Sequence, residues 1–84
     1  MKSSLDSKTK TVAGNIRRIR VFRNYTQDYL AMKLDITQNA YSKIELGYSN
    51  ITLNRLISIA EVLDIDPVTL ISCEGDQLLQ IRKP

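Results

Sequence analysis

The sequence contains no histidine, no tryptophan and a single cysteine, Cys73. A zinc site is therefore not expected, because zinc needs several Cys, His or carboxylate ligands close together. The lone cysteine also excludes an internal disulfide framework and suits a reducing compartment. The same absences argue against an enzyme, since we find no paired carboxylates and no nucleophile with a general base. We expect no cofactor, and the sequence gives no sign of a small-molecule substrate.

Long hydrophobic runs are missing as well. No apolar stretch approaches the roughly 20 residues that a membrane-spanning helix needs, and the opening stretch MKSSLDSKTK is too polar for a signal peptide. We therefore expect no membrane partner and a cytoplasmic location. With 84 residues, of which 43% are hydrophobic and 25% charged, the composition is that of one globular domain.

Charge is distributed unevenly along the chain. Residues 1–10 carry three lysines against one aspartate, a net charge of +2, and residues 11–60 carry seven Lys/Arg against three Asp/Glu, a net charge of +4. Residues 61–84 carry two Lys/Arg against five Asp/Glu, a net charge of −3. The first 60 residues therefore favour an anionic partner, and we expect the acidic end to face away from it.

The beginning of the chain divides into a polar stretch and a helical pattern. Residues 1–11 are rich in Ser, Thr and Lys, and we expect them to form a flexible arm. After them, Val12, Ile16 and Ile19 recur at helical spacing. This spacing predicts a first helix over about residues 13–23.

Three threonines indicate where the next helices start. Thr26, Thr37 and Thr52 each precede a helical pattern, and a hydroxyl at such a position can accept a hydrogen bond from a free backbone N–H. The first of these helices is QDYLAMKL, and the next is QNAYSKIEL, which Gly47 ends. The last begins with LNRLISIAEVL, whose apolar residues are nearly continuous. We expect it to be the most buried helix.

A short fifth helix, PVTLI, begins at Pro67 with Asp66 as its cap. Beyond it the pattern of apolar residues is poor. The sequence therefore predicts an all-α chain with a flexible arm at residues 1–11, a domain at 12–72, and a tail at 73–84 that is a candidate dimerisation segment.

The second and third helices are separated only by the short segment DIT. Such a connection makes them cross at a steep angle, which is the helix-turn-helix arrangement. Asp35 in this turn can adopt a positive φ. On the third helix, Ala40, Tyr41 and Ile44 can share a buried side, which leaves a polar stripe exposed. The polar stripe consists of Gln38, Asn39, Ser42 and Lys43.

The segment TQDYLAMKLDITQNAYSKIELG resembles the helix-turn-helix of the phage-repressor-like family, the Cro and cI type also called XRE. The flanks agree, since NIRRIR resembles that family's first helix and TLNRLISIAEVLDIDPVTLI its fourth and fifth, so the resemblance covers residues 13–71. It implies a compact five-helix, lambda-repressor-like domain whose third helix enters the major groove of double-stranded DNA. It further implies a transcriptional regulator that represses by occupying its site, and a homodimer.

The resemblance also implies roles for individual residues. The polar stripe matches positions that face base edges, where Gln and Asn can bond adenine and Lys can bond guanine. Arg20 and Glu45 match a structural ion pair between the first and third helices, so we expect neither to contact DNA. Other positions match contacts to DNA phosphates or are candidates for such contacts. These are Gln27, Thr37, Tyr48, Asn50, Thr52 and Arg17.

Two departures from the family pattern concern the same surface. Asp35 stands where the family usually has glycine, which adds a negative charge not far from DNA. Leu46 and Tyr48 stand where relatives often have Asn, Lys or Arg. Two of the usual phosphate contacts are therefore in question, although a tyrosine hydroxyl can donate to a phosphate.

Two other functions fit the same sequence. Antitoxins and restriction-modification controller proteins have this domain and little else, and gene neighbourhood would distinguish them from a repressor. A protein-interaction module that has lost DNA binding would show acidic or bulky residues on the outer face of the third helix. Here that face is polar with one cation, Lys43.

Overall fold

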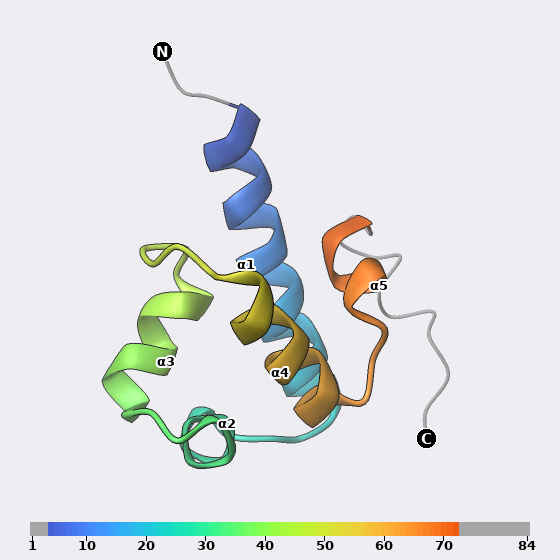
Figure 1. Ribbon diagram of the computed structural model, residues 1–84. Helices are drawn as coiled ribbons and strands as arrows, with labels where there is room; N and C mark the ends of the chain where they lie inside the picture. Colours follow the sequence, from blue (N-terminus) through green and yellow to red (C-terminus); the bar gives the residue numbers. More distant parts are fainter. Residues whose placement is uncertain (1–3, 73–84) are drawn as a thin grey trace.

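The computed structural model describes residues 4–72, and these residues form five helices and no strand (Figure 1). This is the predicted all-α architecture. No helix in this range is long and apolar enough to cross a membrane. The predicted dimerisation tail at 73–84 lies outside the described residues. The helices are α1 (Ser4–Phe22), α2 (Gln27–Leu34), α3 (Gln38–Glu45), α4 (Leu53–Leu63) and α5 (Pro67–Ser72).

The first helix is longer than predicted. α1 begins at Ser4, so the flexible arm predicted at 1–11 is wrong for residues 4–11. This stretch contains no glycine or proline to interrupt a helix, and its leucine and two lysines have good helix propensity. The hydroxyl of Thr11 donates to the carbonyl of Ser7 at 3.0 Å, along the helix.

Side-chain caps fix the starts of the other four helices, as the sequence predicted. The hydroxyls of Thr26, Thr37 and Thr52 accept hydrogen bonds from backbone N–H groups three residues ahead, at 3.0, 3.0 and 3.1 Å. A carboxylate oxygen of Asp66 accepts from the N–H of Val68 at 2.8 Å and caps α5. Each cap satisfies a donor that the helix leaves free, which typically contributes about 1 kcal/mol.

Residues with positive φ end the helices and turn the chain. Asp35 after α2 has φ 59°, which confirms that it takes the predicted left-handed conformation without being glycine. Asn24 and Asp64 end α1 and α4 in the same way, with φ 63° and 55°. Gly47 follows α3 with φ 79°, where a side chain would be strained. Of these turns, the one at Asp35 connects α2 to α3.

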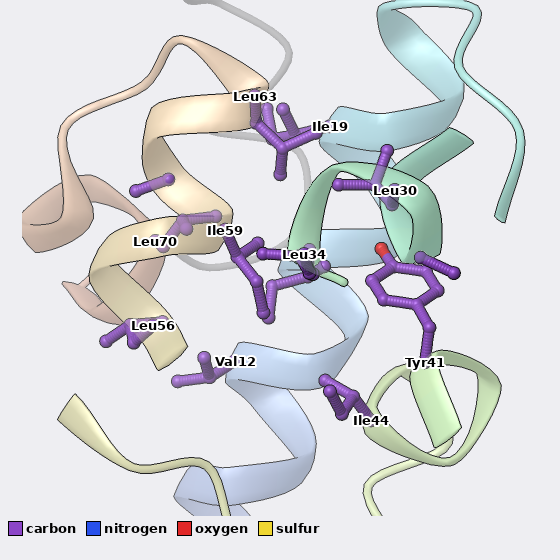
Figure 2. Packing of buried hydrophobic residues seen from close by; sticks show 13 residues of the cluster. Val12, Ile19, Leu30, Leu34, Tyr41, Ile44, Leu56, Ile59, Leu63 and Leu70 are labelled. Carbon is purple, nitrogen blue, oxygen red and sulfur yellow. The ribbon is translucent and has the colours of Figure 1, made fainter. Parts of the chain in front are cut away.

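The hydrophobic core lies where the five helices meet (Figure 2). The ring of Tyr41 points from α3 into this core between residues of α1 and α2, and it is fully buried. The inner side of α3 is thereby fixed on the other helices. Other fully buried core residues come from each remaining helix, and they include Ile16, Ile19, Leu30, Ile59, Leu63 and Leu70.

One prediction about burial is wrong, and not every apolar residue of α4 is buried. Ala40 was placed on the inner side of α3 but is exposed, since it lies about 100° around the helix from Tyr41 and beyond Ile44. On α4, Leu53 and Ile57 are 68% and 40% exposed. A nearly continuous apolar sequence cannot turn every side of its helix to a core that lies on one side.

Candidate nucleic-acid interface

The polar stripe of α3 is open to solvent. Gln38, Asn39 and Lys43 are exposed and Ser42 is half-buried. At 3.6 residues per turn these four positions fall within an arc of about 140°. The opposite side of α3 is buried in the protein. The structure therefore presents the four predicted base-contacting residues together, on a helix whose other side is held by the core.

The carboxylate of Glu45 connects α3 to α1. Arg20 donates from Nε to Glu45 Oε2 at 2.5 Å and from Nη2 to Oε1 at 3.1 Å, so the predicted ion pair forms. The hydroxyl of Tyr41 donates to Oε2 at 2.6 Å. The side chains of Arg20 and Glu45 are 11% and 2% exposed. Both are thus largely removed from water, and their contact fixes the end of α3.

The surroundings of Glu45 change the acidity of three groups. Burial alone would raise the pKa of Glu45, but hydrogen bonds from Arg20, Tyr41 and Gln27 outweigh it and lower that pKa below its usual value. Burial, followed by the hydrogen bond to Glu45, raises the pKa of Tyr41. The hydrogen bond to Glu45 raises the pKa of Arg20. At neutral pH Glu45 is therefore an anion that accepts bonds from a cation and a neutral hydroxyl.

Gln27, the first residue of α2, also reaches this carboxylate. Its Nε2 donates to Glu45 Oε1 at 3.1 Å. A carboxylate can only accept, so it fixes which atom of the Gln27 carboxamide faces inward. The amide nitrogen carries two hydrogens, and the second can be donated to another acceptor. Sequence reasoning missed this contact because the two residues are 18 positions apart and no local pattern connects them.

The other predicted phosphate contacts lie around α3. Thr37 and Thr52 are exposed, and their hydroxyls accept cap bonds but can still donate their own hydrogens. Tyr48 is 76% exposed. Asn50 is exposed, as is Arg17 on α1. Every side chain predicted to contact a phosphate, other than the half-buried Gln27, is therefore exposed.

Two arginines for which the sequence predicted no partner in the protein, Arg23 and Arg55, close the ends of other helices. Arg23 donates to the carbonyls of Leu63 and Asp64 at 2.8 and 3.0 Å. Arg55 donates to the carbonyl of Leu34 at 3.3 Å. A cation near the last carbonyls of a helix is favourable. The partners are far apart in sequence, so no local signal could have found these contacts.

Comparison with known proteins identifies the family. A family model described as helix-turn-helix matches residues 16–70, and the chain belongs to this family of DNA-binding domains, the XRE or Cro/cI type. The chain is 33% identical over 63 residues to the uncharacterized HTH-type transcriptional regulator YqaE of Bacillus subtilis (strain 168). The match covers 75% of this chain and 54% of YqaE, so the chain spans about half the length of that relative.

Two solved structures share the fold. The clp gene regulator ClgR from C. glutamicum superposes with a TM-score of 0.72 at 17% identity, over 75% of this chain and 82% of that one. The restriction-modification controller protein C.AhdI from Aeromonas hydrophila gives 0.71 at 23% identity, over 76% of this chain and 97% of that one. Both confirm the predicted compact five-helix fold.

Proposed function

We propose that the chain binds double-stranded DNA sequence-specifically and regulates transcription, acting as a repressor that occupies its operator in the cytoplasm. The observation that carries this proposal is the exposed polar stripe on α3, a helix whose inner side is held by Tyr41 in the core and by the ion pair of Glu45 with Arg20. The major groove of B-DNA admits an α-helix. A rigidly held α3 can therefore present its stripe to base edges.

The chemistry of the stripe suits direct readout. The carboxamides of Gln38 and Asn39 can each donate to and accept from adenine, and the ammonium of Lys43 can donate to guanine. The hydroxyl of Ser42 can donate a hydrogen bond to a base or accept one from it. A good bidentate pair contributes about 1–3 kcal/mol of discrimination against the wrong base.

Phosphate contacts would hold α3 in register. The amide hydrogen of Gln27 that Glu45 leaves unused is offered to a phosphate, because the contact with Glu45 fixes the orientation of the carboxamide. The exposed groups of Thr37, Tyr48, Asn50, Thr52 and Arg17 offer further donors. Such contacts position a protein on the duplex but do not read sequence.

We also propose a homodimer. One α3 reads only a few base pairs, and a dimer of such domains reads two half-sites about 34 Å apart, or a multiple of that distance. Val68 and Ile71 on α5 are 65% and 36% exposed, which leaves apolar side chains for a partner. The negative charge of residues 61–84 supports an arrangement in which this end faces away from DNA.

Selection of bound sequences from a pool of random duplexes tests these points together. We expect an enriched motif with two-fold symmetry. A pool without enrichment would contradict sequence-specific binding, and a motif without symmetry would contradict the homodimer.

Single substitutions then test the role of the polar stripe. Lys43→Ala and Gln38→Ala should each weaken binding to the selected site by about 1–3 kcal/mol and relax the preference for it over random DNA. Lys33→Ala is the matched control, since Lys33 is an exposed lysine in the last turn of α2, outside the polar stripe, with its ammonium 5.7 Å from the centre of the Tyr29 ring. Equal losses on both kinds of DNA would show that the stripe does not read bases.

A further inference from the structure

We propose that the first turns of α1 form a second phosphate-binding element, in which Lys8 and Lys10 contact the DNA backbone on either side of the connection between α3 and α4. This connection comprises residues 46–52. The inference rests on the proposed function and adds to it an element that the sequence pattern had assigned to a flexible arm.

The α3–α4 connection itself carries no charge. Its sequence is LGYSNIT, and its most exposed apolar side chains are Leu46 and Tyr48, at 57% and 76%. The connection itself offers a phosphate only neutral donors, such as the Tyr48 hydroxyl and the Asn50 carboxamide. Binding to nucleic acid depends largely on Lys and Arg that replace counterions at phosphates. The nearby cations belong to neighbouring elements. Arg55 of α4 lines a pocket with Ser49, Asn50 and Thr52, and Lys8 and Lys10 lie on α1.

Lys10 lies against the beginning of the connection. A Cβ added to Gly47 would lie 3.2 Å from Cγ of Lys10, 3.7 Å from its Cα and 3.9 Å from Cβ of Ala13. The connection therefore passes close to α1 at this point. Figure 1 shows the first turns of α1 extending past this connection. The first carbons of the Lys10 side chain therefore lie beside Gly47, and the side chain is exposed. In the sequence, Gly47 is flanked by Leu46 and Tyr48.

Lys8 lies at the other end of the connection. It is exposed and lines a shallow pocket together with Ile51, Thr52 and Leu53, where the connection enters α4. The two lysines are two residues apart in α1, so their side chains leave the helix about 160° apart, one toward each end of the uncharged connection. Among the side chains that the structure describes, neither ammonium forms an ion pair with a carboxylate. Both lysine side chains are exposed, so an anion in solution can approach them.

Because α1 is helical here, the two ammonium groups are held near the connection before DNA binds. A disordered arm would have to be ordered on binding, at a cost in conformational entropy. Contacts from the helix should be independent of sequence, since they go to phosphates. Each neutralised phosphate contributes about −0.9 to the slope of log K against log salt, which is about a threefold change in affinity between 50 and 200 mM salt.

The test measures dissociation constants of the full chain on operator and random duplexes over a range of salt concentrations. The variants are Lys8→Gln, Lys10→Gln and Lys10→Arg, with Lys33→Gln as the control of equal charge change. We expect each α1 Gln variant to reduce the slope by about 0.9 and to weaken both duplexes alike. Lys10→Arg and Lys33→Gln should keep the wild-type slope, and circular dichroism should show unchanged helix content.

Each other result has a definite meaning. If the wild type binds operator and both α1 Gln variants keep its slope, the inference is overturned and the proposed function stands. If Lys33→Gln loses as much slope as Lys10→Gln, the effect is one of net charge and the inference is overturned. If Lys10→Arg behaves like Lys10→Gln, the side chain packs against Gly47 and does not contact phosphate, which also overturns it. A wild type that binds no DNA overturns both proposals.

Discussion

Replacing Arg20 by methionine removes the positive partner of Glu45 but keeps most of the apolar stem. The carboxylate stays behind in a place where the Glu45 side chain is 2% exposed. It keeps only two neutral donors, the hydroxyl of Tyr41 at 2.6 Å and the amide of Gln27 at 3.1 Å. Arg20→Met also leaves the carbonyl of Tyr25 without the bond from Nη1, which is 2.9 Å long.

Breaking one side of a buried ion pair usually costs about 3–5 kcal/mol. The two remaining donors continue to stabilise the Glu45 anion, so we expect a loss near the lower end, about 3 kcal/mol at pH 7. Domains have roughly 0.05–0.15 kcal/mol of stability per residue, so the loss would be a large part of the total. Arg20→Met/Glu45→Gln removes both charges and leaves an acceptor for Tyr41. It should be more stable than Arg20→Met alone.

The effect should depend on pH in a defined direction. In the wild type the pKa of Glu45 is lowered, so its contribution is present above the usual carboxyl range and is lost as pH falls through the folded pKa, below 4.5. Burial is the largest single influence on the pKa of Glu45, so we expect removal of Arg20 to raise that pKa. The folded variant then binds a proton more readily than the folded wild type. Its deficit relative to the wild type should therefore shrink as pH falls from 7 toward 4.5.

Urea unfolding followed by circular dichroism, at pH 7 and pH 4.5, measures both effects. A variant within about 1 kcal/mol of the wild type at pH 7 would show that the pair behaves like a solvent-exposed one. A deficit of equal size at both pH values would show that lost packing, and not a stranded carboxylate, is the cause. Either result would refute the reasoning.

Three further predictions concern the contacts that support α3 and its neighbours. Tyr41→Phe keeps the buried ring but removes the donor to Glu45, and urea unfolding should show a loss of about 1.5–3 kcal/mol, with no loss if that bond is unimportant. Asn15→Ala deletes the hydrogen bond from the side-chain amide to the carbonyl of Leu70 at 2.8 Å, and should lower the free energy of unfolding by about 1–3 kcal/mol. Backbone amide hydrogen exchange should then become faster in α5 than in the wild type, with a smaller change in α3. Asp35→Gly relieves a left-handed residue with φ 59° and should stabilise by up to about 1 kcal/mol; a lower melting temperature would contradict this.

The sequence by itself determined the starts of α2 to α5 and the turn between α2 and α3. A cap, a positive φ and an amphipathic period each depend on residues within about four positions of one another, so they can be read locally. The stripe on α3 follows from the same periodicity. Its exposure was predicted correctly, whereas Ala40 was misplaced because periodicity does not say where the edge of the buried side falls.

Contacts between residues far apart in the sequence could be found only from the tertiary structure. The burial of Glu45 is set by Arg20, 25 positions away, and the orientation of Gln27 is set by Glu45 in turn. The start of α1 has no amphipathic signal, yet it lies against Gly47 of the α3–α4 connection. Arg23 and Arg55 find carbonyls on other helices in the same way. A charged side chain looks the same in sequence whether it faces water or a partner, and only the packing of the helices brings the partners together.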